Sequence, residues 1–414
     1  MHWFAAVLNA ANFLRYVTRF SCDTFGFYVA WVYLQYGIQV ITRQLSITDP
    51  DSVFVSIILA LVMLVTGHLF GMLARSNIGH RVVRRFFADY GMPISVIACT
   101  GLAYWGRFRL ANPLTLPTSG AFSPAGNRPW LVKFWELEGK WVGIALPFGF
   151  VLFILFYFDH NVSSLIAQGS EYPLRKPPGF HWDFFWLGIS TFLRVPAPNG
   201  LIPQAPMHTE SLVIMGIQRK NDVEKISKNG PSHGREEDFE LHGTQNYESQ
   251  NHQDSAETST LVEEHPIAVV EQRVSNLAQG ALCLVLMSGP LQHVLGLVPR
   301  GVLAGLFWYM GSDHLRVSAV TEKLLYLIRD PAMVSRSEPL RKVRRSRVTL
   351  FVAIELIGFG ATMAVTQTIA AIGFPIVIML LVPVRSWLIP KLPFTPEELS
   401  VLDGPTASPF VVFR

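Results

Sequence analysis

A stretch rich in proline and polar side chains interrupts an otherwise apolar chain at residues 195–216, VPAPNGLIPQAPMHTESLVIMG. A continuous helix could not tolerate these prolines, so we expect an extended segment followed by a short helix that begins at Pro206. The N–H groups of Met207, His208 and Thr209 would then be unpaired at the positive end of the helix dipole. Such a helix start binds anions. A re-entrant structural loop or a proline-kinked helix is the alternative.

An acidic residue, Asp159, lies inside the apolar run FVLFILFYFDHNVSSLIAQ. Isolating a charge in lipid is costly, so an acid at membrane depth is a candidate for function. Asp159, Ser163 and residues 166–167 fall on one helical face and form a small and polar stripe that can face a bundle interior. Asp159 and Ser163 are therefore candidate substrate-binding residues, and Asp159 could bind a coupling proton or cation, gate an anion or hydrogen-bond to it. Alternatively, Asp159 lies near the membrane surface and pairs with a loop Lys or Arg.

Other acids and glycines of the apolar segments carry weaker signals. Glu355 in LFVAIELIGFG is interpreted as a buried packing partner. Asp89 in FADYGMP is interpreted as an acid at a helix start, where it favours the dipole. The glycines of one later segment are expected to permit close helix packing rather than to bind phosphate; they are Gly301, Gly305 and Gly311.

The sequence carries no signature of an enzyme or of a cofactor site. Walker, dinucleotide-binding and hydrolase triad motifs are absent. The three cysteines and the scattered histidines lack the spacing of metal ligands. We therefore expect no catalytic residue, no metal and no cofactor, and ATP-driven pumping by this chain alone is disfavoured.

The composition requires that membrane helices position these residues. Half of the 414 residues are hydrophobic and only 15% are charged, which is too apolar for an ordinary soluble enzyme. A membrane helix needs about 20 mostly apolar residues, and residues 52–74 provide them without one acidic or basic side chain. The pattern predicts an all-α polytopic membrane protein with about ten apolar segments, two of them short. They are residues 25–41, 52–74, 90–105, 144–166, 180–193, 206–215, 274–297, 298–309, 349–369 and 372–389.

Lysine and arginine are distributed unequally between alternate loops. Most of the 34 basic residues fall on one set of loops, and cytoplasmic loops carry such an excess. We therefore expect about ten crossings with both termini in the cytoplasm. The basic run at 341–347 is interpreted as a contact with anionic lipid rather than with nucleic acid. The polar stretch at about 219–265 is expected to be a disordered cytoplasmic insertion.

Several stretches of the chain have sequences that are typical of a known protein family. PNGLIPQAPMHTESL is the most specific of them. The others are RYVTRFSCDTFGFYVAWVYLQYGIQVI, FFADYGMPISV, YFDHNVSSLIAQ, EQRVSNLAQGAL, PRGVLAGLFWYMG and FPIVIMLLVPVRSWLIPKLPFTPEELSVLDG. Together they resemble the bicarbonate transporter superfamily of anion exchangers, and more closely its fungal and plant borate transporters. The likeness covers nearly the whole chain outside the polar insertion.

The resemblance implies a fold of fourteen membrane segments in two inverted repeats, with a core domain that carries the anion and a gate domain that scaffolds the dimer. It also implies site residues. Asp159 matches the acidic position of a core helix that is implicated in transport. Met207, His208 and Thr209 match the start of the second half-helix of the core. Gln204 lies where the anion exchangers have a basic residue, which is compatible with a neutral boric acid or borate substrate.

Relative to this family pattern the chain starts within the fourth membrane segment, so we expect the first half of the core domain and its half-helix to be missing. The domains expected are a remnant of the fourth helix with the first gate helices and an outer loop in 1–140, and the second half of the core in 141–297. The second gate helices are expected in 298–393, and a cytoplasmic tail in 394–414.

Two functional hypotheses from different classes follow. The first is transport of an inorganic anion by movement of the core against the gate, with borate or boric acid efflux before bicarbonate or other anion exchange. The second is a truncated paralogue that does not transport and acts as a membrane scaffold or regulatory partner. The expected partners are the anion, the lipid bilayer and a second copy in a homodimer, with no nucleic acid. The expected location is the plasma membrane, with the vacuolar membrane as the alternative.

Overall fold

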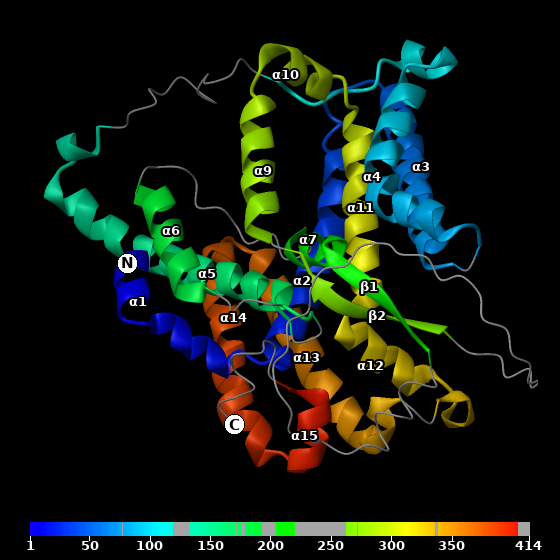
Figure 1. Ribbon diagram of the computed structural model, residues 1–414. Coiled ribbons are helices and arrows are strands. Elements are labelled where there is room, and N and C mark those ends of the chain that lie inside the picture. The colour runs from blue at the N-terminus through cyan, green and yellow to red at the C-terminus, as the bar shows by residue number, and fades with distance from the viewer. Residues whose placement is uncertain are drawn as a thin grey trace, which may run out of the picture.

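The computed structural model describes residues 1–76, 78–118, 133–169, 172–174, 179–192, 204–219, 262–270, 272–335 and 338–404. Within these ranges the regular elements are helices, apart from one two-stranded sheet (Figure 1). The helices are α1 (His2–Val7), α2 (Arg19–Thr42), α3 (Pro50–Arg75), α4 (Arg81–Ala103), α5 (Gly139–Ala167), α6 (Phe180–Phe192), α7 (Gln204–Ser211), α9 (Gln272–Val285), α10 (Gly289–Gly296), α11 (Arg300–Val317), α12 (Ala319–Ile328), α13 (Arg345–Thr366), α14 (Phe374–Pro383) and α15 (Pro396–Leu402). Short turns of 3-10 or π helix are η1 (Ala10–Tyr16), η2 (Gly106–Ala111), η3 (Phe134–Glu136), η4 (Pro331–Met333), η5 (Pro339–Lys342), η6 (Ile369–Gly373), η7 (Val384–Leu388) and η8 (Ile389–Lys391).

The ends of the long helices follow from local sequence. α3 has Pro50 in its first turn, where a missing N–H costs nothing, and an acid in the same turn that suits the dipole. α4 begins at Arg81 because the Nδ1 atom of His80 accepts a hydrogen bond from the N–H of Val82. Asp89 consequently lies in the third turn of α4 rather than at its start, and the interpretation of this acid as a dipole partner is wrong.

Glycines allow α11 to approach two other helices closely. A Cβ atom on Gly301 would lie 2.4 Å from the backbone oxygen of Ser56, and one on Gly305 would lie 2.4 Å from that of Ala60. Gly311 faces α2 in the same way, with 2.8 Å to the backbone oxygen of Ala30. The prediction that these glycines permit close helix packing is confirmed. α11 therefore stands between α2 and α3, and α4 packs on α3 (Figure 1).

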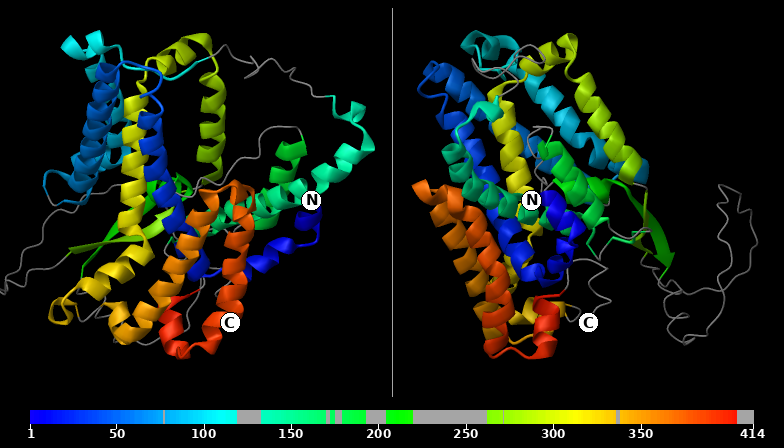
Figure 2. Two further views of the ribbon diagram at one scale, coloured as in Figure 1. Left: turned by 180° about the vertical axis from the view of Figure 1, so that it is seen from behind. Right: turned by 90° about the vertical axis from the view of Figure 1, so that its left-hand side faces the viewer.

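A second group of packed helices lies at the N-terminal end of α2. Helices α12, α13 and α15 meet the start of α2 around two fully buried rings, Phe20 and Phe351, whose centroids are 5.7 Å apart and nearly perpendicular. α13 and α14 run beside each other, and α15 turns back beneath them (Figure 2). This arrangement brings the last described residues of the chain against the beginning of α2.

Five helices are long and apolar enough to cross a membrane, and the count rises to six if α9 and α10, bent by 88°, form one broken span. The search covered the described residues. The five spans are Pro50–Arg75, Val82–Ala103, Gly139–Ala167, Arg345–Thr366 and Phe374–Lys391. Each of the ten predicted apolar segments overlaps a helix, so an all-α polytopic membrane protein is confirmed as the fold class. The number of about ten crossings stays a prediction, because several of these helices are too short or too polar to pass the same criterion.

A β-hairpin departs from the all-helical expectation. Strands β1 (Val213–Arg219) and β2 (Val262–Val269) pair antiparallel, with Val213 opposite Val269 and an irregularity after Ile214. The segment predicted at 206–215 therefore changes from helix to strand, and the two ends of the polar stretch at 219–265 are ordered in strands. Valine and isoleucine favour strands over helices, which accounts for the change. The rest of the predicted insertion, 220–261, lies outside the described residues.

Candidate functional site

The predicted half-helix exists as α7, but it begins at Gln204, two residues before Pro206. A helix with this start leaves the amides of Gln204 and Ala205 without partners inside the helix, and Pro206 has no N–H to offer. His208 and Thr209 fall in the second turn, where N–H groups bond within the helix. The open amides therefore belong to the residues before Met207 rather than to those after it. The predicted extended segment at 195–203 and the Gln204 side chain lie outside the described part of the structure.

The predicted polar stripe on α5 faces the protein interior. Asp159 is 9% exposed and Ser163 is 2% exposed, in a helix whose buried residues all lie in its C-terminal third. The N-terminal half of α5 is exposed and largely apolar from Trp141 to Phe150, as a lipid-facing segment would be. Among the described residues, no hydrogen-bond or ion-pair partner of Asp159 is found. The alternative in which a loop Lys or Arg neutralises this acid has no support in this part of the chain.

α7 is attached to the end of α5 by a side-chain hydrogen bond. The Oγ1 atom of Thr209, a residue only 1% exposed, donates to the backbone oxygen of Ala167 at 2.8 Å. Ala167 is the last residue of α5, where carbonyls have no partner inside the helix. It lies on the face that carries Asp159 and Ser163, about 12 Å along the axis from Asp159 at 1.5 Å per residue. The structure thus places the half-helix against one end of the polar stripe.

α9 also contacts α7 through hydrogen bonds. The side-chain amide of Gln272 donates to Thr209 Oγ1 at 2.9 Å, and Ser275 Oγ lies 3.0 Å from Nε2 of His208. Ser275 Oγ also donates to the backbone oxygen of Gln272 at 2.9 Å, so the imidazole N–H is left to act as donor to Ser275. The hydroxyl of Thr209 consequently links three helices, α5, α7 and α9.

Gln272 and Ser275 were missed as site residues from the sequence. They belong to EQRVSNLAQGAL, which carried the family resemblance without an assigned role. A signal was present, because both are polar residues one turn apart at the start of an amphipathic helix. Their partners are 63 and 67 residues away in the chain, a separation that no local pattern predicts.

The geometry divides the predicted site residues into two groups. His208 and Thr209 are occupied in fixing α7 to its neighbours, whereas Met207 is 44% exposed and makes no such contact in the described structure. Asp159 and Ser163 are buried on α5, and no hydrogen bond or ion pair among the described residues joins their side chains to α7. The arrangement combines open amides at a helix start, which attract oxygen-rich anions, with a buried carboxyl group that can accept hydrogen bonds or take a proton.

Comparison with known proteins agrees with this architecture. A family model described as the HCO3- transporter integral membrane domain matches residues 33–226 and 248–407. The chain is 37% identical to "Boron transporter 1" of Saccharomyces cerevisiae, over 99% of this chain and 66% of that protein. It is 41% identical to a Schizosaccharomyces pombe protein with a provisional transporter name, over 97% of this chain and 72% of that protein. It is 30% identical to "Probable boron transporter 3" of Arabidopsis thaliana, over 96% of this chain and 62% of that protein.

These matches extend over nearly the whole chain, which spans about two thirds of the length of the relatives. They include both the α5 stripe and the half-helix α7, and they agree with the resemblance found in the sequence. The family model by itself covers most of the chain on both sides of residues 227–247. The protein therefore belongs to the family of the HCO3- transporter integral membrane domain.

Proposed function

We propose that this chain transports a small inorganic anion across a membrane, with borate or boric acid as the first candidate and bicarbonate as the second. Membership of the bicarbonate transporter family and the names of the boron transporters among its relatives support this proposal. The observation that carries it is the Thr209–Ala167 hydrogen bond, because this bond attaches the half-helix to the face of α5 that bears Asp159. No observation on the described residues favours the hypothesis of a scaffold that does not transport.

The chemistry of boric acid suits these groups. Boric acid has three hydroxyl groups and borate has four, so either solute can accept hydrogen bonds from amides and donate others to a carboxylate. In the proposed site, the amides of Gln204 and Ala205 donate to the solute, and Asp159 and Ser163 accept hydrogen bonds from its hydroxyl groups. Bicarbonate has a single hydroxyl group and would use the carboxyl group less fully. His208 and Thr209 act by holding α7 in position.

The wider organisation of the transporter is part of the same proposal. The substrate-bearing part consists of α5, α6, α7 and α9, and moves against a gate formed by α2, α3, α4, α11, α13 and α14. Two copies associate through the gate in the plasma membrane, with both termini in the cytoplasm. The unequal distribution of basic residues supports this orientation.

The test is boron export from yeast cells that lack their own boron exporter. The chain is expressed alone and, in a second arm, completed by the portion of "Boron transporter 1" that it does not match. Asp159→Asn is the site variant. Asp89→Asn is the matched control, since it makes the same change at an exposed acid of α4. Membrane levels are measured by immunoblot.

We expect lower boron accumulation in at least one arm with the native site. Asp159→Asn should abolish the effect at equal protein level, and Asp89→Asn should retain it. The assignment fails if neither arm moves boron or bicarbonate when Asp159 is intact and the protein reaches the membrane. Bicarbonate flux without boron flux would retain anion transport and reject the first-named substrate.

A further inference from the structure

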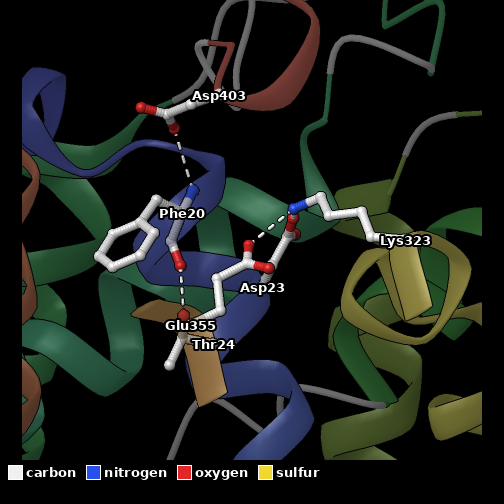
Figure 3. Close-up of polar contacts among 6 residues, drawn as sticks. All are labelled: Phe20, Asp23, Thr24, Lys323, Glu355 and Asp403. Atoms are coloured by element: carbon white, nitrogen blue, oxygen red, sulfur yellow. Dashed lines mark hydrogen bonds and ion pairs between the residues drawn. The ribbon is translucent and has the colours of Figure 1, made fainter. Parts of the chain in front are cut away.

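A buried ionic cluster lies at the start of α2, away from the candidate anion site. The Nζ atom of Lys323 on α12 is 2.6 Å from Oε1 of Glu355 on α13 and 3.4 Å from Oδ2 of Asp23 on α2. The three side chains converge from three different helices (Figure 3). Glu355 and Lys323 are almost fully buried, with side chains 0% and 6% exposed, and Asp23 is 18% exposed. The prediction that Glu355 is buried is thus confirmed, and the partner of its carboxylate is the ammonium group of Lys323.

The ammonium group of Lys323 is fixed by its surroundings. It lies 4.7 Å from the centre of the Phe351 ring, in addition to its contacts with the two carboxylates. A lysine has three donors, and these neighbours account for its directions of interaction. A metal ion could not enter between the carboxylates without displacing this side chain.

A neighbouring acid, Asp403, has its own basic partner and does not share the charge of the cluster. Asp403 is fully buried and accepts a hydrogen bond from the N–H of Phe20 at 3.0 Å (Figure 3). It accepts a second one from Nε of Arg385 at 2.6 Å. Arg385 therefore neutralises Asp403. Among the residues that the structure describes, the other charged group that acts on Asp23 is Arg19, whose side chain is exposed and screened by solvent. The cluster of Asp23, Lys323 and Glu355 must reach its own balance.

Counting charges shows that the cluster lacks one positive charge. Two carboxylates and one ammonium sum to −1 when all are ionised. One atom records the deficit: Oε2 of Glu355 is buried and has no hydrogen-bond partner in the described structure. An uncompensated charge in a protein interior is strongly unfavourable, and such groups usually take up a proton instead. A single proton would make the cluster neutral.

We infer that Asp23, Lys323 and Glu355 form a proton-binding site in which the two carboxyl groups share one proton. The reaction is a simple equilibrium: one carboxylate plus one proton gives one carboxylic acid, with the ammonium of Lys323 retained. The partly exposed edge of Asp23 is the route by which the proton exchanges with solvent. This site is separate from the anion site, since its three groups lie on α2, α12 and α13. Loss of the proton would charge the joint between these helices and loosen it.

Infrared spectroscopy of the purified protein in detergent tests the proton directly. A protonated carboxylic acid has a carbonyl band that a carboxylate lacks and that shifts in heavy water. We expect a pH titration to remove such a band from the native protein, and Glu355→Gln or Asp23→Asn to alter or abolish it. Asp159→Asn serves as the control, because any band from that acid is removed by that substitution alone. Both cluster variants preserve shape, and Glu355→Gln retains an oxygen that accepts from Lys323.

Lys323→Met gives a second, independent readout. The ammonium group of Lys323 lies within 4 Å of both acids and favours their ionised forms. Without this cation, the carboxylic acid band should persist to a higher pH, at proton concentrations about 10- to 1000-fold lower than in the native protein. The inference is overturned if Glu355→Gln and Asp23→Asn leave every carboxylic acid band of the folded protein unchanged. It is also overturned if sodium ions at constant pH remove the band, because the site would then take a metal cation. Neither result depends on transport, so the proposed function stands or fails separately.

Discussion

Removing the hydroxyl group of Thr209 should separate the half-helix α7 from its two supports. Thr209→Val keeps the size and the branched shape of the side chain, so buried packing is retained. The variant loses the hydrogen bond to the backbone oxygen of Ala167, 2.8 Å long, and the one accepted from Gln272, 2.9 Å long. The carbonyl at the end of α5 and the amide at the start of α9 are left without this partner.

The size of the effect follows from these two bonds. A hydrogen bond of this kind contributes about 0.5–1.5 kcal/mol, so the pair contributes about 1–3 kcal/mol to the attachment of α7. That range corresponds to a roughly 5- to 150-fold shift from attached to detached α7. Thr209→Ser keeps the hydroxyl group and should restore most of the attachment. Thr349→Val is the matched control, because the exposed hydroxyl of Thr349 only bonds back to Arg345 within its own helix.

Hydrogen exchange of residues 204–211 in the purified protein measures the attachment, and boron export measures its consequence. We expect faster exchange in α7 of Thr209→Val by the factor given above, with normal exchange in α13 of Thr349→Val. Export should fall in the first variant only. Equal exchange in α7 of the native protein and Thr209→Val would refute the argument that this hydroxyl group holds the half-helix.

Two further predictions concern the gate helices and the C-terminal end. Gly305→Ala should destabilise the protein by about 1–3 kcal/mol, because the new Cβ atom would lie 2.4 Å from the backbone oxygen of Ala60. Gly360→Ala is the control and should cause no loss of stability, because no atom lies within 4 Å of the position of its Cβ atom. Melting temperatures of the two variants in detergent test this difference. The carboxylate of Glu398 accepts a hydrogen bond from the N–H of Thr395, and this bond holds the pKa of the carboxyl group below its usual value. The ionised carboxylate therefore stabilises the folded protein fully above about pH 4.3, and this stabilisation is lost as the pH falls through the lowered pKa. Melting curves at several pH values should therefore favour the native protein over Glu398→Gln at neutral pH and converge in acid, and a difference that persists in acid would contradict this assignment.

The chain sequence was sufficient for the elements that depend on local pattern. Long apolar runs predict α3, α5 and α13, because a run of this length with at most one charged residue is stable as a helix in a membrane. Three glycines in one segment predict the close approach of α11, since a residue without a side chain lets another helix come near wherever it packs. The prolines before Met207 predict a half-helix, and the structure contains it as α7, which begins two positions earlier than predicted and ends at Ser211, before strand β1.

The tertiary structure decided which distant groups meet. Lys323 and Asp23 are 300 residues apart, and nothing in either segment indicates that a third helix brings Glu355 to the same point. The hydrogen bond between Gln272 and Thr209 also joins residues that are 63 positions apart. Hydrogen bonds and ion pairs depend on distances of a few ångströms in space, whereas a periodic pattern in the sequence describes only neighbours along the chain, so it does not predict such pairs. The sequence alone determined the long apolar helices, the presence of a short helix after the prolines, and the family. The folded chain determined how α5, α7 and α9 are joined and where the buried charges balance, because both depend on burial and three-dimensional distance.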